Sequence, residues 1–464
     1  MPDVDVVVIG SGAAGLAAAL SAREHGARDV LVAEAEGVVG GSSRLSGGLM
    51  MGAGTRYQRA RDITDDADSL FHDYLQLNQW QVESAVVRRL AERCGQTVEW
   101  VGDLGVSFYD ELVFGGDERV PRAHCPIGRG QAVVDVLARE CRRAGVDIAL
   151  GRRVDHLIVD DGAVTGVAVG SDTITARAVV VASGGFGNDP AKLASRYPSA
   201  AQTGWAWYIG ADGSRGDHLD FARQADAQLL GHDRGLRLPH ANFAPIYEAY
   251  LPGWLVLVNT EGRRFCDETA PYGIMDGLLA AQGDTAYAIF DHAALTEATE
   301  AGVAHYKQQV PGSTKKQSPH WNADVIERMV DEGTVSRADS VAELAASLRV
   351  PADHLTATVA RHNAATAAGE DVDYLKDPAF LRPLATAPFY GAEVRPATVC
   401  FTACGLRIDR DARVLGESGE PVPGLFAAGE SAGGVIGPRY VGSGNSYASC
   451  LTFGRIAGES ATLT

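Results

Sequence analysis

The glycine-rich stretch "VVVIGSGAAG" constrains the fold of this chain more than any other feature of the sequence. It places Gly10, Gly12 and Gly15 in G-x-G-x-x-G spacing between a hydrophobic strand and a helix. The first glycine permits a sharp turn, the second lets the backbone approach a pyrophosphate, and the third lets the helix pack closely on the strand. This predicts a dinucleotide site at the helix N-terminus. The other residues of the turn predicted to bind are Ser11, Ala13 and Ala14.

An acidic residue follows the next predicted strand. The segment "DVLVAEA" ends in Glu34 and Ala35. Glu34 lies about 20 residues beyond the first glycine, where a carboxylate of such a site binds the ribose hydroxyls. A glycine triplet alone is weak support, but here strand, turn, helix and acid occur in the expected order. The first segment therefore predicts a βαβ unit that holds a nucleotide at its glycine turn.

Three later stretches favour FAD over NAD. "EGVVGGSSRLSGG" follows the acidic residue, "VVVASGGFG" covers residues 179–187, and "PVPGLFAAGES" covers residues 421–431. A simple nicotinamide domain needs no late glycine-rich strand, whereas the flavin ring of FAD lies far from the adenine and needs further segments to hold it. The FAD-binding residues predicted from these and neighbouring stretches are Gly41, Ser42, Ser43, Ser46, Gly47, Gly48, Val154, Ser183, Gly184, Gly429, Glu430, Asn445 and Ser446.

Charge and composition argue against several classes of partner. Acidic residues outnumber basic ones by 59 to 41, and the net charge of −18 repels nucleic acid. No run approaches the ~20 apolar residues of a membrane helix, and the hydrophobic N-terminal stretch lacks the basic flank of a signal peptide. The 7 cysteines form no C-x-x-C pair, so no metal site is predicted. We expect a cytoplasmic protein without a membrane span.

The pattern of the chain indicates two domains. Strands alternate with helices in the first half, and strands with glycine-rich turns return near the C-terminus, before a final helix at 446–461. Between them, aromatic residues cluster at 243–254 and helices with polar faces follow. We predict an α/β fold in which a discontinuous Rossmann-type FAD-binding domain, residues 1–235 and 396–464, carries an inserted α+β substrate domain, residues 236–395. The helices predicted in the inserted part are 322–332, 341–347 and 353–368.

Five segments together resemble the fumarate reductase / 3-ketosteroid dehydrogenase superfamily of flavoproteins. They are "GSGAAGLAAALSA", "GGSSRLSGG", "ASGGFG", "VNTEGRRFCDE" and "VPGLFAAGESAGG…GSGNSYASCLTFGRIAG", and they run from end to end of the chain. The resemblance implies FAD, a glutathione-reductase-like cofactor domain, and a capping domain that carries part of the active site. It also implies an oxidoreductase that acts on CH–CH groups.

Three stretches decide which branch of the superfamily the chain resembles. Fumarate reductases of this type have an arginine shortly after the "GRRF-x-x-E" segment, and here that position is Tyr272 in "DETAPYG". Their histidines before the "T-x-G-G" turn are absent from "CFTACG". In "RYVGSGN", Tyr440 and Gly444 form the Y-x-G-x-G pattern that resembles delta-1 3-ketosteroid dehydrogenases.

By this resemblance Tyr272 is the base that removes a proton from the carbon next to a carbonyl. The Tyr440 hydroxyl and the Gly444 N–H hold the carbonyl oxygen, while the next carbon passes hydride to flavin N5. The predicted activity is desaturation of a cyclic or steroid-like ketone, with electrons passed on to an unidentified acceptor. A second tyrosine usually assists; Tyr109 in "SFYDELVFGG" is the candidate, and its competitors are Tyr57, Tyr208, Tyr247 and Tyr250.

Arg439 keeps an alternative open. It lies one position out of register from the arginine that binds the substrate carboxylate in fumarate-type enzymes. If its guanidinium faces the substrate, the chain reduces an unsaturated carboxylate, as fumarate reductases do, or desaturates a cyclic keto acid; if it faces solvent, the substrate is a neutral ketone. A flavin-binding partner or electron-transfer protein without turnover is a further alternative, although no haem motif accompanies it.

Overall fold

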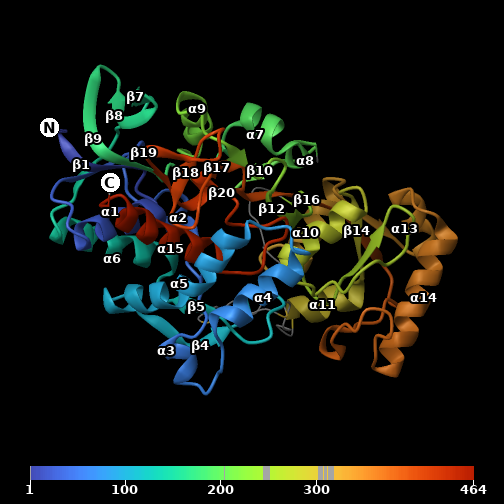
Figure 1. Ribbon diagram of the computed structural model, residues 1–464. Helices are drawn as coiled ribbons and strands as arrows, with labels where there is room; N and C mark the ends of the chain where they lie inside the picture. The colour runs from blue at the N-terminus through green and yellow to red at the C-terminus, as the bar shows by residue number, and fades with distance from the viewer. Residues whose placement is uncertain are drawn as a thin grey trace. The chain divides into compact units, whose positions relative to one another are not determined.

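The computed structural model describes residues 2–202, 204–243, 251–300, 307, 311 and 318–463, which form two compact units (Figure 1). The first unit comprises Met1–Ala201, Tyr208–Leu236 and Cys400–Thr464, so it contains both ends of the chain. The second comprises Gln202–Trp207 and Arg237–Val399. The functional division into an FAD-binding domain and a substrate domain at 236–395 stays a prediction.

The first unit is built on an eight-stranded sheet. Its central strands β1 (Val4–Ile9), β2 (Val30–Ala33), β9 (Asp172–Val181) and β19 (Pro421–Ala427) run parallel in the order β19-β9-β1-β2. The run "VVVI" of β1 is buried residue after residue, as expected for a parallel strand that is covered on both faces. The predicted βαβ start is therefore confirmed. The strands that complete the sheet are β6 (Asp147–Ala149), β7 (His156–Asp160), β8 (Ala163–Val169) and β18 (Arg413–Leu415).

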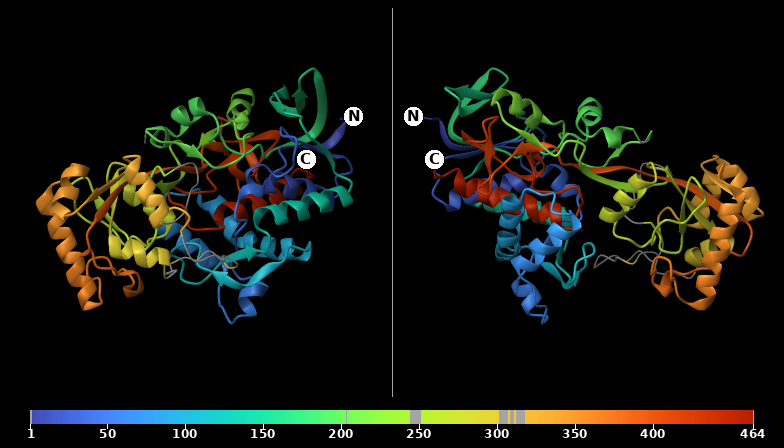
Figure 2. Two further views of the ribbon diagram at one scale, coloured as in Figure 1. Left: turned by 180° about the vertical axis from the view of Figure 1, so that it is seen from behind. Right: turned by 45° about the vertical axis from the view of Figure 1, so that its right-hand side comes forward.

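Small residues bring two helices of this unit close together. α1 (Ala13–Glu24) and α15 (Asn445–Ser460) lie side by side in Figures 1 and 2. A Cβ on Gly454 would lie 2.3 Å from the carbonyl oxygen of Ala14, so only glycine fits at this crossing. The alanine-rich sequence of α1 is thus explained by a neighbouring helix that packs against its backbone.

The remaining elements of the first unit surround this core. Two three-stranded sheets, β3-β5-β4 and β11-β17-β20, accompany the main sheet. The elements are α2 (Gly41–Leu45), β3 (Met50–Met51), α3 (Arg56–Arg59), α4 (Ala67–Leu77), α5 (Ser84–Asp103), β4 (Phe108–Val113), β5 (Ala123–Pro126), α6 (Arg129–Arg143), α7 (Pro190–Arg196), α8 (Pro198–Ala201), α9 (Asp217–Gln224), β11 (Leu229–Leu230), β17 (Gly405–Arg407), η2 (Gly429–Ser431) and β20 (Ala432–Gly433).

A six-stranded sheet organises the second unit. Its longest strand, β16 (Phe389–Thr402), pairs antiparallel with β14 (Ala286–Asp291) and β15 (Val335–Ala338). Stacked rings of Phe290 and Tyr390, with centroids 5.2 Å apart, fill the core on one face. The remaining elements are β10 (Trp207–Tyr208), β12 (Gly235–His240), β13 (Val256–Asn259), α10 (Tyr272–Ala281), α11 (His292–Glu300), α12 (Ala323–Asp331), α13 (Val341–Leu348), α14 (Ala352–Ala368) and η1 (Pro378–Phe380).

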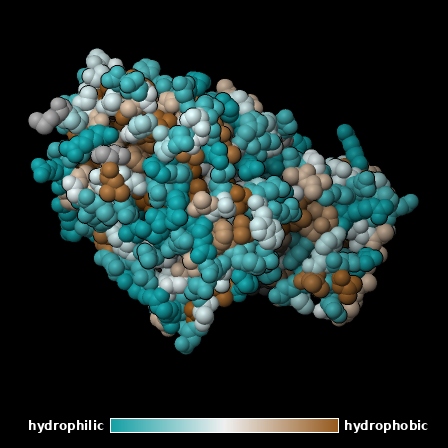
Figure 3. All heavy atoms as spheres, viewed as in Figure 1, coloured by the Kyte–Doolittle hydropathy of each residue, from teal (hydrophilic) through white to brown (hydrophobic). Residues whose placement is uncertain are grey.

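The helices predicted in the second half of the inserted part are confirmed by α12, α13 and α14. α10 was not predicted, and it begins at Tyr272. Much of the aromatic run 243–254, including Tyr247 and Tyr250, lies outside the described residues. None of the helices in the described part of the chain is long and apolar enough to cross a membrane. Hydrophilic residues cover most of the face shown in Figure 3, in line with the net charge of −18.

Candidate functional site

A cleft lies at the carboxyl ends of β1, β2 and β9, between the strands where the order of the sheet reverses. This is the position at which open α/β sheets bind ligands. About 750 Å³ of the cleft is not filled by protein atoms. The predicted cofactor-binding residues that line it are Gly10, Ser11, Gly12, Ala13, Ala14, Glu34, Ala35, Gly41, Ser42, Ser43, Val154, Ser183, Gly184, Gly429 and Glu430.

The three glycines of the first turn have three different surroundings. Gly10 has a φ of +100°, and a Cβ on it would lie 2.4 Å from the Ala182 carbonyl oxygen. A Cβ on Gly15 would lie 1.9 Å from the Gly10 carbonyl oxygen, so Gly15 serves helix–strand packing and does not line the cleft. A Cβ on Gly12 would meet nothing nearer than the Ser43 hydroxyl oxygen at 3.6 Å. The protein itself therefore leaves room at Gly12, beside the cleft.

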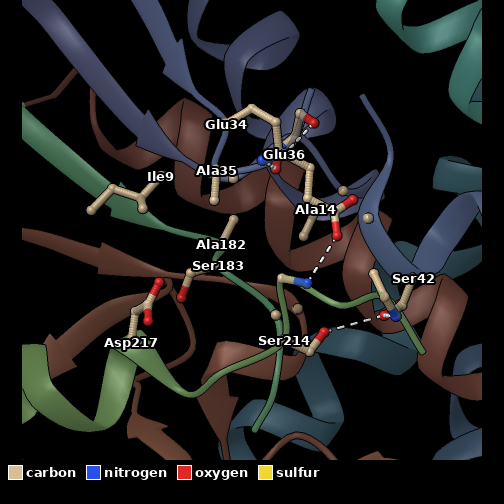
Figure 4. A pocket seen from close by; sticks show the side chains of 18 of the residues that line it. Ile9, Ala14, Glu34, Ala35, Glu36, Ser42, Ala182, Ser183, Ser214 and Asp217 are labelled. Atoms are coloured by element: carbon tan, nitrogen blue, oxygen red, sulfur yellow. Dashed lines mark hydrogen bonds between the residues drawn. The ribbon is translucent and has the colours of Figure 1, made fainter. Parts of the chain in front are cut away.

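Glu34, which the sequence predicted, and Glu36, which it did not, both line the cleft (Figure 4). Glu34 Oε2 accepts hydrogen bonds from the backbone N–H and the hydroxyl of Ser11, and its Oε1 accepts from the N–H of Glu36. Glu36 Oε1 accepts from the N–H of Gly213 at 2.8 Å. Its buried Oε2 makes no hydrogen bond within the described residues, and lies 3.8 Å from an Arg44 nitrogen. Glu36 thus presents an acceptor for a ligand hydroxyl.

A third carboxyl group, that of Glu430, lies in η2. Its Oε1 accepts hydrogen bonds from the N–H and the hydroxyl of Thr402, at 2.7 Å and 2.8 Å. A Cβ on Gly185 would lie 1.9 Å from this oxygen, so the glycine-rich segment after β9 is shaped to fit Glu430. Burial raises the pKa of Glu430 to about 7.

Six predicted cofactor residues do not line the cleft, and other residues do. Ser46 and Gly48 hold the end of α2 against α6, since the Ser46 carbonyl accepts from Gly130 N–H and a Cβ on Gly48 would collide with Gly130. The six are Gly15, Ser46, Gly47, Gly48, Asn445 and Ser446. Lining residues that the sequence did not indicate include Glu36, Arg152, Arg153, Ala211, Gly213, Ser214, Asp217 and Cys450. Arg152 and Arg153 directly precede the predicted Val154, and this proximity in the sequence could have indicated them as lining residues.

The Tyr440 hydroxyl and Gly444 both lie at the N-terminus of α15. The Tyr440 hydroxyl oxygen accepts the Ser446 N–H at 3.1 Å and lies 3.1 Å from the Ser446 hydroxyl. Gly444 caps the helix with a φ of +94°, and its own N–H makes no hydrogen bond to any residue that the structure describes. Tyr440 is 6% exposed, and burial raises its pKa above the usual value. The tyrosine therefore stays protonated near neutral pH, and a donor N–H lies on the same turn.

Tyr272 is the first residue of α10 and is half-buried. Pro271 caps the helix without a side-chain hydrogen bond, so Tyr272 stands at the start of a helix. One turn later, Asp276 is held by Arg237 at 2.9 Å. Four residues earlier, Glu268 is fully enclosed and paired with Arg264 and Lys376.

The other candidates differ in exposure. Tyr109 lies in β4, half-buried, and has no hydrogen bond to Tyr440 or Gly444 among the described residues. Tyr208 lies 3.4 Å from the Ser42 hydroxyl, beside the cleft. Arg439 is exposed, and its guanidinium makes no ion pair with a residue in the described ranges. Its backbone N–H is engaged by the side-chain oxygen of Asn78 at 2.7 Å.

A family model described as an FAD binding domain matches residues 5–447. The chain belongs to this family. It is 33% identical over 475 residues to fumarate reductase (cytochrome) from Shewanella frigidimarina, covering 99% of this chain and 77% of that protein. It is 30% identical over 372 residues to 3-oxosteroid 1-dehydrogenase from Mycobacterium tuberculosis, covering 71% of this chain and 62% of that protein. The structure of 3-ketosteroid-delta4-(5alpha)-dehydrogenase from Rhodococcus jostii RHA1 superposes with a TM-score of 0.80 and 26% identity, covering 99% of this chain and 96% of that one.

The chain is thus an FAD-dependent oxidoreductase of the fumarate reductase / ketosteroid dehydrogenase family, and its cofactor is FAD. The cleft fits FAD in three respects. Gly12 leaves room for a pyrophosphate to approach the backbone, and the N-terminus of α1 lies at the cleft, where the Ser43 hydroxyl accepts the N–H of Ala13. The third respect is Glu36, whose buried Oε2 has no hydrogen bond among the described residues. Among the described residues, no group of three histidine, cysteine or acidic side chains is arranged to hold a metal ion.

Proposed function

We propose that this flavoprotein introduces a carbon–carbon double bond next to the carbonyl of a cyclic or steroid-like ketone. The observation that carries the proposal is the pairing of Tyr440 and Gly444 at the N-terminus of α15. A hydroxyl and a backbone N–H on one turn form a donor pair of the kind that binds an oxygen on which negative charge develops. A ketone that loses a proton from the adjacent carbon develops this charge on its oxygen.

The surroundings of Tyr440 suit a hydrogen-bond donor. Its oxygen accepts the Ser446 N–H at the positive end of a 16-residue helix, which makes the hydroxyl a stronger donor. Its raised pKa keeps the proton on the oxygen, so Tyr440 donates to the carbonyl and does not act as a base. A single donor of this kind typically contributes about 2.7–4 kcal/mol to the stability of the transition state.

Tyr272 is assigned as the base that takes the proton from the carbon next to the carbonyl. A phenolate matches the acidity of such a carbon better than a carboxylate does, because the phenol of a solvated tyrosine has a pKa of about 10. Bound FAD supplies the acceptor for the hydride that leaves the next carbon.

The exposure of Arg439 favours a neutral substrate. An arginine that binds a substrate carboxylate needs its guanidinium inside the site, where the ion pair is shielded from water. The exposed side chain of Arg439 does not supply this. The names of the M. tuberculosis and R. jostii relatives, both ketosteroid dehydrogenases, agree with a ketone substrate.

Reduction of an unsaturated carboxylate is the second candidate, because the S. frigidimarina relative is a fumarate reductase. In this candidate, or in desaturation of a cyclic keto acid, Arg439 would have to turn toward the substrate and bind its carboxylate. The exposed side chain of Arg439 has several rotatable bonds, so its guanidinium can point in another direction. The two candidates therefore make opposite demands on Arg439.

Anaerobic mixing distinguishes the candidates. The oxidised holoprotein is mixed with 3-ketosteroids and cyclohexanones, or with succinate and related acids, and the visible absorbance of the flavin is followed. The reduced holoprotein is mixed with unsaturated dicarboxylates. We expect ketones to bleach the flavin, with the same rate in Arg439→Ala. Two results would instead assign an unsaturated carboxylate as the substrate. One is flavin bleaching by dicarboxylates but not by ketones. The other is reoxidation of the reduced flavin by unsaturated acids in the wild type but not in Arg439→Ala.

A further inference from the structure

The segment Val435–Asn445, here called the clamp segment, contains Tyr440 and Gly444 and connects β20 to α15. Before Asn445, the first residue of α15, it forms no helix and only one isolated bridge, between Gly116 and Gly442. Its backbone must therefore be held by groups from elsewhere. Since a displacement of about 1 Å at a reacting group costs on the order of 100-fold in rate, whatever holds the segment influences turnover.

Two buried side chains of α4 and its C-cap hold one side of the clamp segment. The Tyr74 hydroxyl donates to the Val435 carbonyl at 3.0 Å and accepts from the Asn445 side-chain amide at 2.9 Å. Asn78, which caps α4, accepts the Arg439 N–H at 2.7 Å through Oδ1 and donates to the Tyr74 carbonyl at 3.0 Å through Nδ2. Tyr74 and Asn78 therefore bind both ends and the middle of the segment.

The close fit extends to the backbone. A Cβ on Gly437 would lie 2.3 Å from Asn78 Oδ1, so the chain passes directly over that side chain. Tyr74 is 1% exposed and Asn78 is 2% exposed. A buried polar group that loses its partner is costly, because water cannot replace the bond. The geometry of the segment is thus tied to these two side chains.

A buried carboxyl group, Glu118, holds the other side. Its two oxygens accept the N–H groups of Gly115 and Gly116, at 3.2 Å and 2.7 Å. The Gly115 carbonyl in turn accepts the Ser443 N–H at 2.7 Å, one residue before Gly444. A Cβ on Gly115 would lie 2.4 Å from the Ser443 carbonyl oxygen, so the two strands of backbone touch. Glu118 is therefore connected to Ser443, the residue before Gly444, through the Gly115–Gly116 turn.

We propose that Tyr74, Asn78 and Glu118 are positioning residues that fix the Tyr440 hydroxyl and the Gly444 N–H relative to each other, so that both reach one carbonyl oxygen. This rests on the proposed function, in which those two donors bind the ketone. The hydrogen bonds of the three side chains go to the clamp segment, to its support at Gly115 and Gly116, and to the Tyr74 carbonyl. Their influence on the reaction passes through the segment, so it depends on Tyr440 being able to donate.

A double-mutant cycle tests this on the FAD-loaded full chain. Tyr74→Phe removes one hydroxyl and keeps the ring, and it is combined with Tyr440→Phe. The rate of flavin bleaching at saturating ketone is measured for both single variants and the double variant. Tyr390→Phe is the control, since it removes another buried hydroxyl, one that is bonded to Glu327 in the second unit. FAD content and unfolding midpoint are recorded for every variant.

We expect Tyr74→Phe to slow bleaching by about 10- to 100-fold with FAD retained, and to slow it by less than about threefold when Tyr440 is already phenylalanine. Tyr390→Phe is expected to bleach at the wild-type rate. Equal slowing by Tyr74→Phe in both backgrounds, or no slowing at all, would overturn the proposal.

A second variant covers the case in which Tyr74→Phe does not fold. Glu118→Gln replaces one accepting oxygen by an N–H donor opposite Gly115 or Gly116, and the same dependence on Tyr440 is expected. The failure of the proposed function is seen separately. If no ketone bleaches the wild-type flavin, the ketone function and this positioning role fall together; if the wild type bleaches and the cycle is additive, only the positioning role falls.

Discussion

The cofactor cleft of the first unit and the residues before α10 in the second unit consist of different kinds of residue. Glycine turns, short hydroxyl side chains and backbone N–H groups dominate the cleft. Shortly before α10 in the sequence, by contrast, Glu268 belongs to a buried ionic network of long side chains. Glu268 accepts from both Arg264 and Lys376, and Arg264 also binds Asp371 at 2.8 Å.

This difference determines what each region tolerates. A turn built from glycine fails when a Cβ enters it, whereas a buried ionic network fails when one charge is removed. Burial acts to raise the pKa of Glu268, but the charges of Lys376 and Arg264 hold it below its usual value. Tyr272 follows Glu268 by four residues, so we infer that the network fixes the start of the helix that carries it.

The largest effect is expected in the ionic network. Lys376→Met leaves Glu268 and the Leu255 carbonyl without the buried ammonium group that now lies 2.9 Å from each. We expect about 3–5 kcal/mol of destabilisation, measured by chemical denaturation with a fluorescence probe. The control is Arg328→Met, which removes an exposed ion pair to Glu332 and should cost less than about 1 kcal/mol. Equal effects would show that the buried network contributes no more to stability than an exposed ion pair does.

The next effect separates ligand binding from folding in the cleft. Gly12→Ala adds a methyl group where the protein leaves room, so the apoprotein should unfold as the wild type does. We expect FAD affinity to fall by about 10-fold or more, because the methyl group occupies the space that a pyrophosphate approaches. Titration of the apoprotein with FAD measures this.

Two further glycine-to-alanine variants serve as controls for Gly12→Ala. Gly15→Ala should destabilise the fold itself, since its Cβ would lie 1.9 Å from a carbonyl oxygen. Gly37→Ala, with nothing within 4 Å of its Cβ, should change neither folding nor affinity. If Gly12→Ala binds FAD as tightly as Gly37→Ala does, the pyrophosphate does not approach this turn.

Most of the residues predicted to bind the cofactor line the cleft, because their signals in the sequence are local. The roles of Gly10, Gly12 and Gly15 follow from local backbone geometry, which a short motif specifies completely. Glu36 was missed because the pattern calls for a single acid after the strand, and its partner Gly213 lies far along the chain. The Gly213 and Ser214 loop carries no motif, so only tertiary structure brings it to the cleft.

The clamp segment was predicted in part for a similar reason. Tyr440 and Gly444 stand in a recognisable spacing, and the helix predicted near Asn445 is confirmed. Tyr74 and Glu118 lie hundreds of residues earlier, in stretches without a motif. Side-chain support from distant elements leaves no local pattern in the sequence.

The helix α10 was missed for another reason. Its segment "PYGIMDGLLAA" lacks a capping side chain, which is the usual signal for the start of a helix.

The smallest effect is a pH dependence of the apoprotein. Burial raises the pKa of Glu430 from 4.5 to about 7, so its contribution to stability is fully present below about pH 4.5 and is lost as the pH rises through about 7. We expect the unfolding midpoint of the apoprotein to fall over this window, and Glu430→Gln to flatten the profile. The exposed Glu417→Gln serves as the control. An unchanged profile in Glu430→Gln would assign the pH dependence to other groups.

The most direct test of the central claim is the effect of Tyr272→Phe on ketone-driven flavin reduction. Anaerobic stopped-flow mixing compares it with the wild type and with Tyr287→Phe, a half-buried tyrosine of β14 in the same unit. We expect Tyr272→Phe to retain FAD and to bleach about 100- to 10,000-fold more slowly, while Tyr287→Phe bleaches as the wild type does. Bleaching of Tyr272→Phe at the wild-type rate would contradict the assignment of Tyr272 as the base.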